Sequence, residues 1–471
     1  MNLVEAFLRQ VEARPDAIAI VTGQGRAVSY AELAKASARR AHAYECSGIV
    51  AGDVVLIARG VSVELYETLL AVFRLGAVAM FPEPAAGIRG LRLACQAVRP
   101  KAIATAGIGG IIRLLLPELQ RLKPLPDPNG MEPRRDILAS QSGDAPALIT
   151  FTSGSTGRPK GIVRSSDFLM LQHTLLEKLR QTEPEDVDLI SLPVFILSNL
   201  AVGATSVIPE GKLTRPAKLK GETLRQQIDD HRVNRIVAPP AVVARIAEDA
   251  PPLLGIEAVF TGGGPVFPNL LRSAQRAAPK AAIHAVYGST EAEPIAHVEL
   301  KEIEAADWEA MAGGAGLLAG RPIPEIEVEL RDHEVFVAGP HVNQGYLDPA
   351  DDASTKSIRD GTLWHRTGDA ARLDDKGRLW LLGRREAASR GLFPFAVETA
   401  ALSWPGVRQA ALLAGPGRAK LALSGDALDI ASLQARAAKL GDIEVVALKS
   451  VPMDKRHNSK ADYAKLRRML S

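Results

Sequence analysis

At 471 residues the chain is too long for a single hydrophobic core, so we expect at least two domains. Its 57 Lys and Arg against 54 Asp and Glu leave a formal net charge of +3, and these charges form no basic block, which argues against a nucleic-acid partner. The hydrophobic fraction of 46% and the charged fraction of 24% are those of an ordinary globular protein.

Neither a secretory signal nor a membrane span is predicted. The first residues carry charges throughout, and Cys46 and Cys95 show neither metal-ligand spacing nor a disulfide framework, so we expect a cytoplasmic protein. The stretch 189–209 lacks charge and is long enough to cross a bilayer. Because Pro193 and Gly203 help to divide it into short pieces, we expect a buried strand, a helix and a second strand, and no transmembrane segment.

From the start to about Glu299, short β-rich runs alternate with amphipathic segments. Helices are predicted over 62–75 and 90–98, where apolar residues recur at three- and four-residue spacing. The candidate strands are 17–21, 53–58, 77–81, 102–105, 235–238, 256–260 and 281–285. This alternation predicts a mostly parallel sheet with helices on both faces, and ligands bind such sheets beyond the carboxyl ends of the strands.

The most informative stretch is Thr150–Gly161, TFTSGSTGRPKG, which follows the apolar strand predicted from Pro146. Its glycines let the chain turn sharply and aim backbone N–H groups inward, which makes an anion site. Its hydroxyls and its lysine suit phosphate oxygens, although a surface loop is the alternative for this stretch alone. The candidate ligand-binding residues are Thr152, Ser153, Gly154, Ser155, Thr156, Gly157 and Lys160.

A second glycine-rich loop follows the strand predicted to end at Phe260. It comprises Gly262, Gly263, Gly264 and Pro265. One interpretation is a tight turn before a helix that begins near Pro268. The other is a bare backbone wall against which a flat purine or an acyl group can lie.

A third loop, AVYGSTEAE at 285–293, combines an aromatic residue, a glycine, hydroxyls and carboxylates after a buried strand. The Tyr287 ring can stack on a base, the Thr290 hydroxyl can bond a phosphate, and the Glu291 carboxylate can hold Mg²⁺. Gly288 and Ser289 lie between them. The alternative is that Glu291 is a solvated charge at the start of a helix.

Beyond about Gly320 the pattern changes to strand pairs and turns, with strands predicted at 326–330 and 334–338. Further on, Asp369 ends the sequence HRTGD, where a turn-forming role is the simplest interpretation. A helix at 429–440, a strand at 443–448 and a helix at 461–470 predict a small α+β unit at the C-terminal end.

These motifs, in this order and spacing, resemble those of the adenylate-forming superfamily, which contains acyl-CoA synthetases, peptide-synthetase adenylation domains, luciferases and β-lactone synthetases. The 152–161 loop resembles the phosphate-binding loop of that family, and YGSTE resembles its Y-G-x-T-E motif. The resemblance implies an ATP site that also includes Asp369 on the ribose hydroxyls and Arg384, beside the hinge, on the ribose or a phosphate. It further implies that Lys460 is the catalytic lysine, that Thr290 and Lys460 bracket the α-phosphate, and that Glu291 binds Mg²⁺.

The same resemblance implies an α/β fold: a large N-terminal domain, 1–382, with mostly parallel, doubly wound sheets and a small β-rich subdomain, followed by a small mobile α+β lid, 383–471. It also implies an acyl pocket. The predicted pocket residues are Phe195, Leu197, Asn199, Leu200 and Gly262. No charge between 195 and 200 can pair with an amino acid's ammonium group, which favours a fatty, aryl or hydroxylated acyl substrate.

The expected reaction is ATP-dependent activation of a carboxylic acid as acyl-AMP, with release of pyrophosphate. Transfer to a thiol of CoA or an acyl carrier protein would follow. A first alternative is a β-lactone synthetase, in which the substrate's own β-hydroxyl captures the acyl group. It rests on similarity to that group in the stretches 73–78, 192–209 and 454–460. A second alternative is a non-catalytic nucleotide-binding homologue.

Overall fold

The computed structural model describes residues 2–83, 86–106, 113, 116–140, 142–152, 159–248, 251–415, 417–454 and 460–470. The chain divides into two compact units: Met1–Glu210 with Asn343–Lys356, and Gly211–Val342 with Ser357–Ser471. The boundary predicted at 382/383 falls inside the second unit and stays a prediction. Across the described ranges, every helix is too short or too polar to cross a bilayer.

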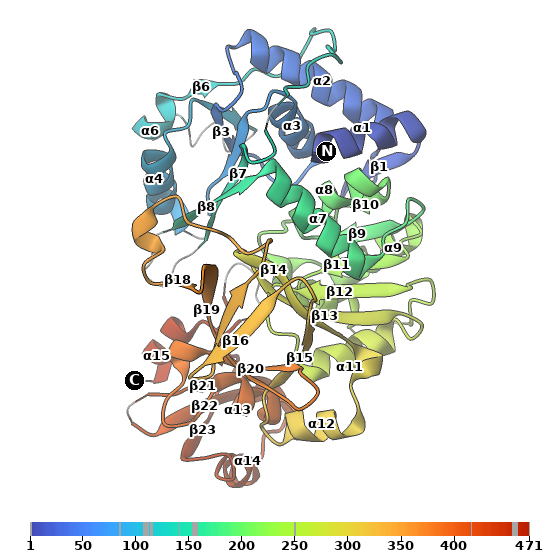
Figure 1. Cartoon of the computed structure of the whole chain (residues 1–471). Helices are drawn as coiled ribbons and strands as arrows, with labels where there is room; N and C mark the ends of the chain where they lie inside the picture. The colour runs from blue at the N-terminus through green and yellow to red at the C-terminus, as the bar shows by residue number, and fades with distance from the viewer. Residues whose placement is uncertain are drawn as a thin grey trace. The chain divides into compact units, whose positions relative to one another are not determined.

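The first unit contains a six-stranded sheet in the order β6-β5-β3-β4-β7-β8 (Figure 1). Its neighbouring strands are parallel except for β7 and β8, which are antiparallel. Leu56, Met80 and Ile103 pack with Ala94 and Cys95 of a covering helix in one apolar core. The strands are β3 (Val54–Ala58), β4 (Val78–Phe81), β5 (Ala102–Thr105), β6 (Lys123–Pro124), β7 (Pro146–Thr152) and β8 (Lys160–Ser165).

The first unit also holds four strands in the order β9-β10-β1-β2. They are β1 (Ile18–Val21), β2 (Ala27–Ser29), β9 (Val187–Ile190) and β10 (Thr205–Val207), and only β1 and β2 are antiparallel. The helices of this unit are α1 (Leu3–Ala13), α2 (Tyr30–Cys46), α3 (Val63–Arg74), α4 (Gly87–Val98), α6 (Pro117–Gln120), α7 (Ser166–Arg180), α8 (Pro193–Val202) and η4 (Pro349–Asp351). The uncharged stretch 189–209 therefore forms a strand, a helix and a strand, as predicted.

In the second unit the strands follow the order β16-β17-β19-β20-β15-β14-β13-β12-β11. In this order β11, β12 and β13 are parallel, whereas the neighbours from β13 along to β16 are antiparallel. The change from parallel to antiparallel pairing thus begins at the β13–β14 hairpin, before the position near Gly320 that the sequence indicated. The strands are β11 (Arg235–Ala238), β12 (Ala258–Gly262), β13 (Ala282–Ser289), β14 (Ala292–Glu299), β15 (Leu317–Pro322), β16 (Glu327–Arg331), β17 (Glu334–Ala338), β18 (Lys356–Arg359), β19 (Thr362–Leu373) and β20 (Leu379–Arg384).

The C-terminal part of this unit is a three-stranded sheet, β21-β22-β23, drawn in orange to red in Figure 1. Successive side chains of a strand point to opposite faces. Accordingly Leu412 and Leu421 lie in one core with Val397 of α13, while Ala411 and Ala422 lie in another with Leu466 of α15. The strands are β21 (Val407–Leu413), β22 (Ala419–Gly425) and β23 (Ile443–Ala447).

The remaining helices of the second unit are η2 (Pro216–Lys218), α9 (Gly221–Asp230), α10 (Pro240–Ile246), α11 (Pro268–Ala277), η3 (Leu300–Glu302), α12 (Ala305–Ala312), η5 (Arg385–Ala387), α13 (Pro394–Ala401), α14 (Ile430–Ala437) and α15 (Tyr463–Leu470). Proline occupies the first positions of α10, α11 and α13, where its missing N–H costs nothing and its fixed φ suits a helix. The helix predicted near Pro268 and the small C-terminal α+β unit are both present.

Candidate active site

A cavity of about 140 Å³ in the second unit brings together predicted residues that are almost two hundred positions apart in the sequence. It is lined by strands of the large sheet, by the turn after β12, and by the segment before α15. Its predicted members are Gly263, Gly264, Pro265, Tyr287, Gly288, Asp369, Arg384 and Lys460. The apolar side chains of Leu318 and Leu381 complete part of the wall.

The Asp369 carboxylate is the polar centre of this cavity. Its Oδ2 accepts a hydrogen bond from the Tyr287 hydroxyl at 2.9 Å, and its Oδ1 lies 3.2 Å from Nη1 of Arg384. Arg384 also donates to the Thr367 carbonyl at 2.9 Å, which fixes the guanidinium beside the carboxylate. Each carboxylate oxygen keeps a lone pair for a further donor, so the pair of oxygens can still receive two hydroxyls.

These contacts determine the ionisation of Tyr287 and Arg384. Burial, reinforced by the charge of Asp369, raises the pKa of Tyr287 well above its ordinary value. The charge of Asp369 raises the pKa of Arg384 and outweighs the effect of burial. Tyr287 therefore stays a neutral donor, and Arg384 stays a cation, at neutral pH. The turn-forming interpretation of Asp369 was wrong, because the residue lies inside β19 and pairs with Arg384 across β20.

The glycines after β12 have different reasons to lack a side chain. Gly262 is buried, and a Cβ there would lie 2.6 Å from the Val286 carbonyl oxygen of the neighbouring strand. Gly263 has φ +74°, a conformation that favours glycine, and a Cβ on it would point into open space. Gly262 thus allows close strand packing, whereas Gly263 makes the turn toward α11 that leaves a bare backbone at the cavity.

The third predicted loop is a β-hairpin. β13 continues to Ser289 and β14 begins at Ala292, so Thr290 and Glu291 form the turn, and the predicted loop from 285 and the alternative of a helix start were wrong. The charge of Glu291 contributes to the raised pKa of Arg384, which places this carboxylate near the cavity's cation. In the described residues no three His, Cys, Asp or Glu side chains form a metal cluster. A single carboxylate fits Mg²⁺ held mainly by phosphate oxygens and water.

Lys460 is held by its backbone three residues before α15. Its N–H donates to Oδ1 of Asp454 at 2.9 Å, and its carbonyl accepts from the Asp454 N–H at 2.8 Å. The next residue, Ala461, pairs with Met453 as an antiparallel bridge. These contacts hold the backbone of Lys460 and Ala461 against Met453 and Asp454, with Lys460 at the cavity.

In the first unit, residues 153–158 of the glycine-hydroxyl loop lie outside the described residues. The predictions for Ser153, Gly154, Ser155, Thr156 and Gly157 therefore stay predictions. Thr152 ends β7 and pairs with Lys160, the first residue of β8. Nζ of Lys160 lies 5.1 Å from the centre of the Tyr346 ring, a cation–π contact.

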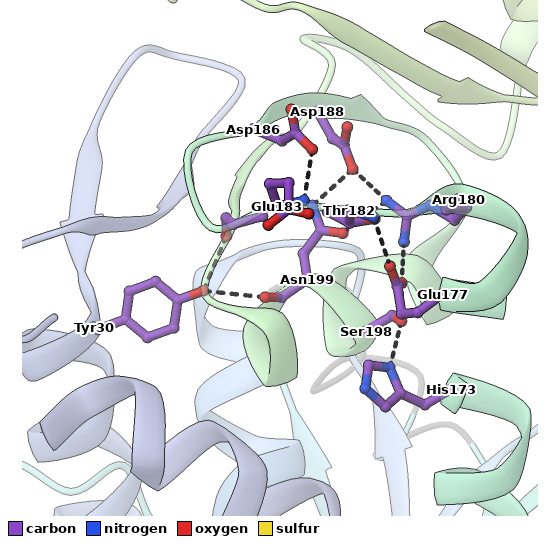
Figure 2. A network of polar contacts seen from close by, with 11 residues as sticks. Tyr30, His173, Glu177, Arg180, Thr182, Glu183, Asp186, Asp188, Ser198 and Asn199 are labelled. Carbon is purple, nitrogen blue, oxygen red and sulfur yellow. Dashed lines mark hydrogen bonds and ion pairs between the residues drawn. The ribbon is translucent and has the colours of Figure 1, made fainter. Parts of the chain in front are cut away.

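The predicted acyl-pocket residues of the first unit lie on α8, and Phe195, Leu197, Asn199 and Leu200 are all buried. The Asn199 amide hydrogen-bonds through both its oxygen and its nitrogen, as Figure 2 shows. Its Oδ1 accepts from Arg180 at 2.8 Å, and its Nδ2 donates to Asp188 at 2.9 Å. The Asn199 side chain therefore connects α8 to α7 and β9. Its role in the acyl pocket stays a prediction.

The sequence interpretation missed the network to which Asn199 belongs (Figure 2). Arg180 forms ion pairs with Asp188 and with Glu177, and the Arg180 and Asp188 side chains are 1% and 0% exposed. The Ser198 hydroxyl donates to Glu177 at 2.7 Å, so the 2.7 Å contact between Ser198 and Nδ1 of His173 requires a proton on that nitrogen. The available signal was the spacing of His173, Glu177 and Arg180 along one face of α7.

The ionisation of His173 and Glu177 follows from this geometry. Burial lowers the pKa of His173, and the Arg180 charge lowers it further against the opposing effect of Glu177. The pKa of Glu177 is lowered although burial alone would raise it, because Arg180 and the hydrogen bonds from Thr182 and Ser198 favour the anion. His173 is therefore neutral and Glu177 is ionised at neutral pH.

Two cavity residues were also missed. Glu398 of α13 and Tyr463 of α15 line the same space as Lys460. The sequence gives little sign of either, because a lone glutamate or tyrosine in an amphipathic helix usually lies at the surface or interface of the core.

Glycines after the parallel strand β12, a tyrosine on β13, an aspartate–arginine pair and a lysine line one cavity, and this arrangement suits a nucleotide-using enzyme. The AMP-binding enzyme family matches residues 7–347, and the chain belongs to this family. The predicted class, an acyl-adenylate-forming ligase that uses ATP, is thereby confirmed.

The chain is also similar to individual proteins of this family. It is 29% identical over 470 residues to the olefin β-lactone synthetase of Xanthomonas campestris pv. campestris, covering 88% of this chain and 84% of that protein. It is also 29% identical over 537 residues to the olefin β-lactone synthetase of Stenotrophomonas maltophilia, covering 99% and 97%. The solved structure of ATP-bound MatB from Rhodopseudomonas palustris has a TM-score of 0.82 and 20% identity over 100% of this chain and 99% of that chain, which confirms the predicted fold class.

Proposed function

We propose that this chain activates a β-hydroxy carboxylic acid with ATP as the acyl-adenylate, and that the substrate's own hydroxyl then captures the acyl group as a β-lactone. The observation that carries the first step is the shared cavity of Tyr287, Asp369, Arg384 and Lys460. The similarity to two olefin β-lactone synthetases over most of the chain supports the second step.

The cavity residues suit the adenosine part of ATP. The Tyr287 ring can stack on the base beside the bare backbone of Gly263 and Gly264. The Asp369 carboxylate, held between Tyr287 and Arg384, can accept hydrogen bonds from the two ribose hydroxyls. Lys160 and the glycine-hydroxyl loop would hold the outer phosphates, as the family resemblance implies.

A carboxylate is a poor electrophile, because its leaving group would be oxide. Attack of a carboxylate oxygen on the α-phosphorus forms a C–O–P linkage and breaks the bond to pyrophosphate, so the oxygen becomes part of AMP. Positioning two anions and neutralising their charge is the protein's task in this step. The Lys460 ammonium and the Thr290 hydroxyl would act at the α-phosphate. Mg²⁺ on Glu291 would supply neutralising charge to the phosphates.

In the second step the β-hydroxyl oxygen attacks the acyl carbonyl. A new C–O ester bond closes the four-membered ring, the hydroxyl loses its proton, and AMP leaves with the electrons of the C–O bond that breaks. Transfer to a thiol of CoA or an acyl carrier protein is the alternative fate of the same adenylate.

Two measurements test this proposal. Pyrophosphate release from ATP with Mg²⁺ should require an added acid, and release that ignores the acid, or no release with any acid, would contradict adenylation. Mass spectrometry of products formed from a 3-hydroxy fatty acid, with and without CoA, should show the acid less one water in both cases. The matched acid without the hydroxyl should release pyrophosphate yet give no lactone. A CoA thioester, or an α-amino acid as the best substrate, would overturn the lactone assignment.

A further inference from the structure

Glu398 is a buried carboxyl at the cavity that the proposed chemistry does not use. Its residue is 3% exposed, and it lines the same cavity as Lys460. One of its oxygens, Oε1, accepts two hydrogen bonds: from the Leu412 N–H of β21 and from the Tyr463 hydroxyl, both at 2.8 Å. A proton on this carboxyl therefore sits on the other oxygen, Oε2, and both hydrogen bonds persist whether or not the carboxyl is ionised.

Tyr463 connects this carboxyl to the catalytic segment. It is the first residue of α15 and follows Lys460 by three positions. Between them, the Asp462 N–H donates to the Pro452 carbonyl at 2.8 Å, next to the bridge between Met453 and Ala461. The backbone of this segment is thus closed on itself, while the Tyr463 hydroxyl ties it to α13, a separate helix.

We propose that the Glu398–Tyr463 hydrogen bond is a latch that positions Lys460 at the cavity. Both are positioning residues, because they act through Lys460 and touch no reacting atom in the proposed chemistry. The inference rests on the proposed adenylation step. It adds to that step a contact whose strength depends on the charge of Glu398.

Burial raises the pKa of Glu398 to about 7, against the opposing effect of its hydrogen bonds from Leu412 and Tyr463. The elements around it are largely apolar: β15 contributes residues 317–319 to the cavity and β20 contributes Leu381. The charged groups that line the same cavity are Asp369, Arg384 and Lys460. On α12, which also packs against α13, the Asp307 carboxylate is paired with Arg378.

The ionisation of Glu398 changes the strength of its hydrogen bond with Tyr463. A hydrogen bond from a neutral hydroxyl to a carboxylate is roughly twice as strong as one to a neutral acid. Raising the pH through about 7 ionises Glu398 and tightens its contact with Tyr463. The turnover that depends on Lys460 therefore rises across this pH range.

Two variants test the Glu398–Tyr463 hydrogen bond and the ionisation of Glu398 separately. Tyr463→Phe keeps the ring and removes the hydroxyl, whereas Glu398→Gln keeps the shape and an acceptor oxygen but cannot ionise. In acid-dependent pyrophosphate exchange, Tyr463→Phe should lower kcat roughly tenfold with little change in KM for ATP, because misplacing a catalytic group affects the transition state more than binding. Glu398→Gln should remove the rise of kcat between about pH 6 and pH 8 that the wild type shows.

A matched control removes a different buried hydrogen bond from the same part of the unit. In Ser424→Ala the hydroxyl that donates to Gln409 at 2.7 Å is lost, while the Gln409 oxygen can still accept from the Val451 N–H, and both partners of the Glu398–Tyr463 hydrogen bond are kept. This variant should keep the wild-type pH profile. The latch proposal is wrong if Ser424→Ala loses the rise of kcat with pH as well, or if Tyr463→Phe keeps the wild-type kcat.

A second measurement does not depend on turnover. Hydrogen–deuterium exchange of residues 449–470 should be faster in Tyr463→Phe than in the wild type, since Lys460 and Asp462 donate their N–H groups within this segment. After correction for the intrinsic pH dependence, protection should increase through about pH 7 in the wild type and not in Glu398→Gln. Absence of pyrophosphate release in the wild type would refute the proposed function. Unchanged hydrogen–deuterium exchange rates in Tyr463→Phe would refute the latch by itself.

Discussion

At the scale of single residues, the cavity of the second unit contains a carboxylate with two different partners. Asp369 receives the Tyr287 hydroxyl on one oxygen and faces Arg384 on the other. A strand residue with that pairing is held more rigidly than a turn residue would be. The family resemblance predicts that Asp369 binds the ribose hydroxyls, and this stays a prediction. The alternative of a turn residue was wrong, because local turn propensity cannot reveal that β19 runs on through the motif.

Asp369→Asn should therefore weaken ATP binding. The amide removes the charge that faces Arg384 and replaces one acceptor with a donor, so a hydrogen bond to a charged group is lost at a cost of about 1.5–3 kcal/mol. Calorimetric titration with ATP and Mg²⁺ should show Kd rising by roughly tenfold to a hundredfold. Asp375→Asn, at an exposed turn position, is the matched control and should bind as the wild type does. Equal affinity of the two variants would remove Asp369 from the site.

Ionisation of the buried Glu398 carboxyl lowers the stability of the folded protein. Its folded pKa of about 7 lies above its ordinary value of 4.5, so the folded state binds the proton more tightly than the unfolded state. Stability from this group is complete below pH 4.5 and is lost as the pH rises through about 7. The loss amounts to about 3 kcal/mol in the free energy of unfolding. The pH range that tightens the latch is thus the range that weakens the fold.

Urea denaturation at pH 5 and pH 8 should reveal this antagonism. All four tryptophans (Trp308, Trp364, Trp380 and Trp404) belong to the second unit, so intrinsic fluorescence follows that unit alone. The stability of Glu398→Gln relative to the wild type should rise by about 2.5 kcal/mol from pH 5 to pH 8, most of the full loss. A difference that does not change with pH would show that the carboxyl ionises normally.

At the scale of secondary-structure elements, α7, α8 and β9 are joined by a buried ion pair rather than by apolar packing alone. The sequence predicted β9 and α8 within the stretch 189–209, because proline and glycine divide that stretch, but it gave no prediction for α7. It could not predict the network, because the partners of Arg180 come from three elements and only tertiary packing brings them together. The same limitation hid the hairpin at 290–291, whose strands are recognisable only once they pair.

Arg180→Leu should be strongly destabilising. The substitution leaves the carboxylates of Asp188 and Glu177 without their common cation in a nearly inaccessible environment. Breaking one partner of a buried pair costs about 3–5 kcal/mol. The matched control is Arg245→Leu, which removes an exposed pair with Glu248 and should cost less than about 1 kcal/mol. Urea denaturation followed by circular dichroism compares them, and similar costs for both variants would contradict a stabilising network.

At the scale of the whole molecule, the two units interleave along the chain. Asn343–Lys356 belongs to the first unit although its neighbours in sequence belong to the second. The contacts that hold it there are specific: the Leu347 N–H donates to the Gly161 carbonyl at 2.7 Å, and Tyr346 bridges to Ile162. No periodicity or composition signals such a return, so sequence analysis placed all of 1–382 in one domain. That boundary describes the expected lid, and it remains a prediction about movement.

Within the second unit, the cavity joins residues of the large sheet to the segment that carries Lys460, and ligand binding should therefore be coupled to the stability of this unit. ATP at one hundred times its Kd should raise the free energy of unfolding by about 2.7 kcal/mol in the tryptophan-monitored transition. Asp369→Asn should lose most of this increase at the same ATP concentration, because its affinity is lower.

Lys460→Ala should behave differently from Asp369→Asn. The lysine is needed when charge develops at the α-phosphate and contributes less to the ground-state complex, so ATP should still stabilise the variant by at least half of the wild-type increase. Acid-dependent pyrophosphate exchange should nevertheless fall by a factor of roughly a hundred or more. Normal exchange in Lys460→Ala would exclude this lysine from the chemical step. Loss of ATP stabilisation together with exchange would instead assign it to nucleotide binding, and the latch would then act on affinity rather than on turnover.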